Sequence, residues 1–295
     1  MVESLSQLTS VEYQVDKLIR GDKETIHENA NKDSSMFSTR RDLIAGQVSK
    51  AKGLQMYSKE VQEAHQSGLI HLHDLDYQPF TSYTNCCLID MKFLFDNGFN
   101  MGGAEIDKPK SIQTAVAQMV QVIANVASSQ LGGCSIQSID ILLAEYAEMN
   151  YKKHLDKAEI YKIPDMENYA LQETKKDIYD AMQSIEYECN TLFTSNGQSP
   201  FITIGFGLGE SWFEREIQKA MLKVRINGLG KSKKTAIFPK QIFVIKDGLN
   251  RKEGDPNYDI KQLALECSSK RMYPDILNYD KIIELTGSFK FPMGK

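Results

Sequence analysis

The chain has 295 residues, of which 41% are hydrophobic and 25% are charged, and its formal net charge is −4. This composition is typical of a globular protein with a sizeable core, and the mild acidity argues against non-specific nucleic-acid binding, which needs a basic surface. The sequence lacks an apolar run long enough to span a membrane and lacks a signal peptide. The five cysteines do not have the spacing of a disulfide framework. We therefore expect a cytoplasmic chain with reduced thiols that forms a single domain over residues 1–295.

Apolar spacing predicts mainly helices in the first hundred residues. An amphipathic stretch covers 11–19, and helical spacing recurs at 41–51 and 58–66. Apolar and polar residues alternate from Leu69 to His73, which predicts a short strand. Residues 86–95 are apolar with a tendency towards helix.

The remaining two thirds alternate between helices and short apolar segments. The clearest helix is 111–130, preceded by Pro109 and followed by a glycine pair. Further helices are predicted at 140–151, 175–194, 210–226 and 260–272. The segments 201–204 and 241–245 read as buried strands. This alternation favours an α/β architecture with parallel strand pairing.

Two histidines and an aspartate form the first group of residues that could carry chemistry. On a strand, His71 and His73 would share one face, next to Asp74. Two imidazoles on one face could bind a metal ion or a phosphate. The alternative is one buried histidine with a backbone partner and one surface histidine. A third metal ligand is not evident nearby, so we predict no metal site.

Cys86-Cys87 and a glycine-rich loop are the other two candidates. Side chains of adjacent residues in an extended segment point to opposite faces, so at most one of the two thiols would enter a given pocket. The alternative is that both are small buried hydrophobic residues. Glycines at 205, 207 and 209 follow a predicted strand and precede a helix, where backbone N–H groups can bind phosphate. Their spacing is not the dinucleotide fingerprint, and such glycines are common.

Several segments, taken together and in order, resemble the anaerobic (class III, glycyl-radical) ribonucleoside-triphosphate reductase family. They are ENANKDS (28–34), AHQSGLIHLHDLDY (64–77), NCCLID (85–90), NGFNMGG (97–103), PKSIQTA (109–115), SSQLGGCSIQSID (128–140), NGQSPFITIGFG (196–207), IFPKQIFVIKDGLN (237–250) and FKFPMG (289–294).

The resemblance implies that the chain is the N-terminal half of such an enzyme. The family fold is a ten-stranded α/β barrel made of two antiparallel halves of five parallel strands, and we expect its first half here with surrounding helices. The radical-bearing cysteine would follow Met293-Gly294, where this sequence has Lys295. An ATP-cone and the zinc-binding, glycyl-radical C-terminal domain are not found in the sequence. We therefore expect no cofactor within the chain, whereas the family uses a glycyl radical, zinc and formate as reductant.

The resemblance also implies an activity and the residues that serve it. In the family, a thiyl radical abstracts the 3′ hydrogen of a ribonucleoside triphosphate, a second cysteine supplies reducing equivalents, and the product is a deoxyribonucleoside triphosphate. The implied catalytic residues are Cys86, Cys87 and Met293, with Cys86 favoured over Cys87. The implied substrate-binding residues are His71, Ser199, Pro200 and Phe201.

Allosteric control is implied as well, by deoxyribonucleotide or ATP effectors at the interface of a homodimer. The implied contacts are Asp107, Lys110, Gln121 and Lys153. A radical-SAM activating protein would be a further partner. We expect the 295 residues to be inactive alone, and the alternative is a catalytically dead fragment that keeps the effector-binding dimer surface. A third hypothesis, independent of the family, is a metal hydrolase at His71, His73 and Asp74.

Overall fold

The computed structural model describes residues 2–22, 35–80, 86–130, 132–191 and 199–291. Contacts divide the chain into two compact units, and each is described by itself. Unit 1 contains Met1–Asn85, Ser128–Leu131 and Phe193–Ser199, and unit 2 contains the rest. The expectation of a single domain over 1–295 stays a prediction.

Unit 1 is helical in its described part. Its elements are α1 (Val2–Arg20), α3 (Phe37–Leu54), α4 (Lys59–Gln66) and the short 3₁₀ helix η1 (Gln78–Phe80). They confirm the helices predicted at 11–19, 41–51 and 58–66. The strand predicted from Leu69 to His73 is wrong, because this segment folds back on α4. The backbone N–H groups of Leu69 and Ile70 donate to the Ala64 carbonyl, and the N–H of Leu72 donates to His65 Nδ1.

Unit 2 is built on a five-stranded sheet in which every neighbouring pair is parallel. The strand order is β1-β4-β5-β6-β7. The strands are β1 (Cys87–Leu88), β4 (Cys134–Ile136), β5 (Ile202–Phe206), β6 (Lys240–Ile245) and β7 (Asp275–Asn278). A separate antiparallel pair joins β2 (Phe99–Met101) to β3 (Ala104–Ile106). The predicted α/β class with parallel pairing is thereby confirmed.

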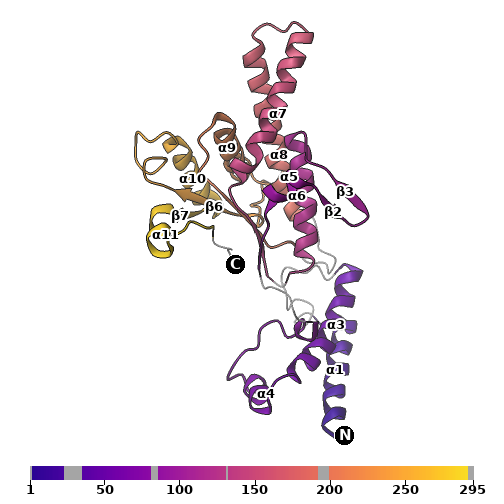
Figure 1. Cartoon of the computed structure of the whole chain (residues 1–295). Coiled ribbons are helices and arrows are strands. Elements are labelled where there is room, and N and C mark those ends of the chain that lie inside the picture. Colours follow the sequence, from indigo (N-terminus) through magenta and orange to yellow (C-terminus); the bar gives the residue numbers. More distant parts are fainter. Residues whose placement is uncertain (1, 23–34, 81–85, 131, 192–198, 292–295) are drawn as a thin grey trace. The chain divides into compact units, whose positions relative to one another are not determined.

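Helices connect the strands of unit 2 (Figure 1). They are α5 (Met91–Asn97), α6 (Ile112–Ala127), α7 (Ile139–Ile160), α8 (Met166–Thr191), α9 (Trp212–Asn227), α10 (Tyr258–Arg271) and α11 (Tyr279–Thr286). The helices predicted over 111–130, 140–151, 175–194, 210–226 and 260–272 are confirmed. Both α7 and α8 extend beyond the predicted ranges, and they pack against each other as the long hairpin of Figure 1.

The two faces of the sheet differ in character, since successive side chains of a strand point to opposite sides. The helix face carries Cys134, Ile136, Ile202, Ile204 and Phe206, all within the main core. The opposite face carries Ser135, Thr203, Gly205, Ile242 and Val244.

A single aromatic ring explains the glycine on this opposite face. Ile242 and Val244 form a second cluster with Phe291. A Cβ atom at Gly205 would overlap the ring of Phe291, so the missing side chain lets that ring lie on the sheet. The chain segment that ends at Phe291 is thereby held against the opposite face.

Candidate functional site

The structure places Cys87 in β1 and Cys86 directly before that strand. Cys87 lies beside Cys134 in the parallel register and packs against the main core, so it belongs to the helix face. From strand alternation we expect the side chain of Cys86 on the opposite face. Both residues are half-buried.

The other three cysteines behave as core residues. Cys134, Cys189 and Cys267 are at most 1% exposed. Burial raises the pKa of the Cys134 and Cys267 thiols to about 12, and it also raises the pKa of Cys189. A thiol with such a pKa stays protonated and is a poor nucleophile. These three buried thiols are therefore not candidates for nucleophilic chemistry.

The glycine loop after β5 binds an internal carboxylate, which contradicts the phosphate-binding interpretation. The N–H groups of Gly207 and Gly209 each donate to Asp140 Oδ2 at 3.0 Å, and Gln218 Nε2 donates to the same oxygen at 2.8 Å. Asp140 is fully buried, and burial raises the pKa of its carboxyl group while the glycine N–H groups act to lower it. Because these N–H groups are already occupied, they are not available to a nucleotide phosphate.

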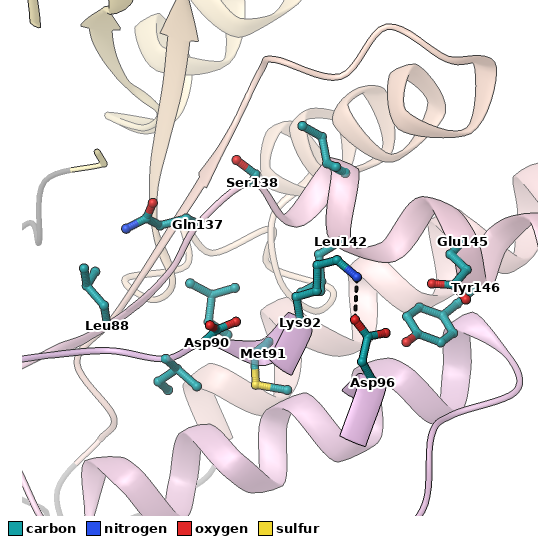
Figure 2. Close-up of a pocket in the computed structure, with 13 residues that line it drawn as sticks. Leu88, Asp90, Met91, Lys92, Asp96, Gln137, Ser138, Leu142, Glu145 and Tyr146 are labelled. Carbon is teal, nitrogen blue, oxygen red and sulfur yellow. Dashed lines mark hydrogen bonds and ion pairs between the residues drawn. The ribbon is translucent and has the colours of Figure 1, made fainter. Parts of the chain in front are cut away.

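A pocket of about 550 Å³ lies at the carboxyl ends of β1 and β4 (Figure 2). The carboxyl ends of parallel strands are the usual place for ligands in α/β folds. The pocket is lined by apolar residues, by the polar residues Gln137 and Ser138 after β4, and by residues of α5 and α7. The lining residues are Leu88, Ile89, Asp90, Met91, Lys92, Asp96, Ile136, Gln137, Ser138, Ile141, Leu142, Glu145 and Tyr146.

The charges at the rim of this pocket are paired with each other. Lys92 contacts Asp96 at 2.5 Å (dashed in Figure 2), and Lys108 contacts both Asp96 at 3.3 Å and Glu145 at 2.7 Å. The hydrogen bond from Lys108 to Glu145 is the main reason why the pKa of Lys108 is raised. Asp90 caps α5 by accepting the N–H of Phe93 at 3.0 Å. The rim is thus close to neutral, and it does not attract phosphate.

The histidines predicted as a substrate or metal site lie in unit 1. His71 is exposed, and its ring centroid lies 5.8 Å from that of His65 and 5.9 Å from that of His73. His73 Nε2 lies 3.3 Å from Asp74 Oδ2. Across the described residues, no group of three or more His, Cys, Asp or Glu side chains could hold a metal ion.

The predicted effector residues gather on α6, α7 and the segment that precedes α6. Lys153 Nζ donates to the Lys110 carbonyl at 2.5 Å, and Gln118 Nε2 donates to the Asp107 carbonyl at 3.2 Å. Gln121 is exposed on α6. The structure therefore brings the Lys153 ammonium group to the backbone of Lys110, across the two helices.

Beneath this surface lies a buried residue that the sequence analysis did not select. Asn150 accepts the N–H of Ile112 at 3.2 Å and donates to Gln113 and Asp177. Asp177 also contacts His154 at 2.8 Å. Asn150 and Asp140 are both polar residues at core positions of a helix whose apolar residues recur periodically. This pattern could have identified both residues from the sequence.

The sequence comparisons agree with this geometry. The family model described as anaerobic ribonucleoside-triphosphate reductase matches residues 28–294. This chain belongs to that family. The anaerobic ribonucleoside-triphosphate reductases of Escherichia coli and Haemophilus influenzae are 58% and 54% identical to it over 270 and 294 residues. These alignments cover 91% and 99% of this chain but 38% and 41% of the two relatives. The enzyme of phage T4 is 51% identical over 280 residues, which are 95% of this chain and 46% of that protein.

Solved structures show the same fold. The anaerobic ribonucleotide reductase of Thermotoga maritima in complex with dATP and CTP matches with a TM-score of 0.59 at 15% identity, covering 95% of this chain and 50% of that one. The same enzyme with citrate in the active site gives a TM-score of 0.63 at 14% identity, covering 98% and 56%. The five parallel strands of unit 2 thus correspond to about half of a reductase of this fold.

The predicted substrate-binding residues 199–201 lie where the chain passes from unit 1 to unit 2. Ser199 belongs to unit 1, whereas Pro200 and Phe201 belong to unit 2. The Phe201 ring packs edge-on against Phe238, with centroids 5.2 Å apart. Met293 lies outside the described residues. In the described part of the chain, no helix is both long and apolar enough to cross a membrane.

Proposed function

We propose that this chain supplies part of the catalytic barrel of a cytoplasmic enzyme that reduces ribonucleoside triphosphates to deoxyribonucleoside triphosphates anaerobically. The reductant would be formate, and a radical-SAM protein would install the glycyl radical. The observation that carries the proposal is the position of Cys86. Cys86 is half-buried directly before the first strand of a parallel sheet, in a chain 51–58% identical to reductases of this family.

The roles that we propose for the individual residues are those that the family resemblance implies. Cys86 would supply reducing equivalents to the ribose, while Cys87 would support the core on the helix face. Met293 would stand beside the radical cysteine, and Pro200 and Phe201 would line the substrate pocket. The exposed ring of His71, together with Ser199, would contact the substrate phosphates or ribose.

A chimeric enzyme tests this proposal. Residues of this chain replace the matching 270-residue segment of the Escherichia coli relative, and the chimera is assayed anaerobically with its activating protein and formate. We expect formation of deoxyribonucleoside triphosphate that requires both formate and activation. A folded chimera that carries the glycyl radical but forms no product would refute the proposed activity.

We also propose a deoxyribonucleotide effector site on the α6–α7 surface of a homodimer, with Asp107, Lys110, Gln121 and Lys153 as contacts. The supporting observation is the contact between Lys153 and the Lys110 backbone, which brings one ammonium group to the segment that precedes α6. Lysine ammonium groups are suited to bind phosphates.

Calorimetric titration of the chain with dATP, dGTP and dTTP tests the effector site. We expect binding of at least one nucleotide, weakened roughly tenfold or more in Lys153→Met, since hydrogen bonds to charged groups contribute about 1.5–3 kcal/mol. Lys152→Met is the matched control, because Lys152 instead pairs with Glu148 at 2.8 Å. Equal loss of affinity in both variants would show that only net charge matters.

A further inference from the structure

A row of side chains at one level on the opposite face of the sheet is polar except at its β1 end. Leu88 of β1 stands beside Ser135 of β4, Ser135 beside Thr203 of β5, and Thr203 beside Lys240 of β6. Strands of parallel sheets are usually apolar on both faces, because both faces are covered. The helix face of these strands follows that rule, whereas this row departs from it.

Ser135 is the most unusual member of the row. It is 2% exposed, and its hydroxyl has no hydrogen-bond partner. Buried polar groups in proteins are nearly always hydrogen-bonded, because leaving one unpaired destabilises the fold. An alanine at this position would avoid that destabilisation. The hydroxyl therefore indicates a function other than stabilising the isolated chain.

The position of Ser135 relative to Cys86 indicates the role. Leu88 stands opposite Ser135. Cys86 precedes Leu88 by two residues, where strand alternation predicts the same face. With neighbouring strands about 4.8 Å apart and about 3.3 Å per residue, Cys86 and Ser135 lie roughly 8 Å apart by strand geometry. Two groups at that separation are near enough to contact the same bound sugar.

We propose that the Ser135 hydroxyl is a substrate-positioning group that hydrogen-bonds a ribose hydroxyl of the ribonucleoside triphosphate beside Cys86. The inference rests on the proposed function, in which the Cys86 thiol reacts at the ribose. The substrate satisfies the unpaired hydroxyl, and the bond holds the sugar in register with the thiol.

The test compares two serine-to-alanine variants in the reductase chimera. Ser135→Ala is expected to raise the KM for ribonucleoside triphosphate about tenfold, the equivalent of 1.4 kcal/mol and of one hydrogen bond. Its urea midpoint is expected to be unchanged or higher, because no partner is lost. Ser184→Ala on α8 is the control, since the Ser184 hydroxyl already donates to Glu188 at 2.6 Å. Its KM should be unchanged.

The outcomes separate this proposal from the proposed function. No turnover by the unsubstituted chimera overturns the proposed function and the role of Ser135 with it. Turnover in which Ser135→Ala keeps the original KM overturns the role of Ser135 alone. A lowered urea midpoint with unchanged KM shows that the hydroxyl is structural. A raised KM with an undiminished midpoint supports substrate positioning, because a structural hydroxyl would produce the reverse pattern.

Discussion

Cys86→Ser in the reductase chimera is expected to reduce turnover by a factor of at least roughly 10²–10⁴, the range for loss of a positioned proton-transfer group. A serine hydroxyl fills nearly the same space, but it does not deliver hydrogen and electrons to a ribose radical as a thiol does. The protein should still fold, because Cys86 lies before β1 and outside the main core. The measurement is deoxyribonucleotide formation under anaerobic conditions with formate.

Cys87→Ser is the matched control for that experiment. Cys87 packs against the main core on the helix face, so serine there should lower stability modestly and leave turnover close to that of the unsubstituted chimera. If instead Cys87→Ser abolishes turnover and Cys86→Ser does not, the assignment of the two faces is reversed. Glycyl-radical content measured in each variant separates loss of chemistry from loss of activation.

Arg225→Met is expected to lower the free energy of unfolding by about 3–5 kcal/mol, the usual cost of breaking a buried ion pair from one side. Arg225 is 1% exposed, and its Nε donates to Glu186 Oε1 at 2.9 Å. Its other nitrogens donate to the carbonyls of Ala236 and Pro239. Without the guanidinium, the Glu186 carboxylate and both carbonyls lose buried partners. Urea denaturation of the chain measures the loss.

A second substitution and a change of pH test this explanation. Arg225→Met combined with Glu186→Leu should recover part of the stability, because the unpaired charge is then removed. Lys270→Met, which breaks an exposed pair with Glu266, should cost about 0.5 kcal/mol or less. A double variant no more stable than Arg225→Met would mean that the lost carbonyl contacts dominate.

The pH dependence follows from the pKa of Glu186. Burial raises that pKa from 4.5 to about 7, although Arg225 acts to lower it. A folded pKa above the unfolded value means that the protonated carboxyl favours folding, fully below pH 4.5 and progressively less as pH rises through about 7. Removing Arg225 raises this pKa further. The stability lost in Arg225→Met should therefore be smaller at pH 5 than at pH 8.

Much of the fold could be predicted from the sequence because long helices repeat their apolar residues many times. The helix predicted over 111–130 and observed as α6 (Ile112–Ala127) shows seven buried positions on one side. The strands β5 and β6, with five and six residues, are also long enough to show an apolar run. In contrast, β1 has two residues and β4 has three, and such segments carry no readable period.

Local alternation was misleading where the backbone bonds to a helix and not to a strand. Leu69 to His73 has the pattern of a strand, yet its backbone bonds to α4. The glycines at 207 and 209 have the pattern of a phosphate loop, yet their N–H groups bind Asp140 from a helix 67 and 69 residues earlier. In both cases the hydrogen-bond partner lies outside the segment whose pattern was used for the prediction.

The sequence by itself determined the family and the α/β class, and it selected the cysteine pair as a candidate for thiol chemistry, since these depend on residue identity, order and local period. The tertiary structure decided that Cys87 belongs to the helix face, because that depends on the register of Cys87 with Cys134. It also revealed the unpaired hydroxyl of Ser135, which is visible only when burial and partners are known. The sheet face and the burial of a side chain depend on contacts between residues far apart in the chain. No local pattern in a single sequence shows those contacts.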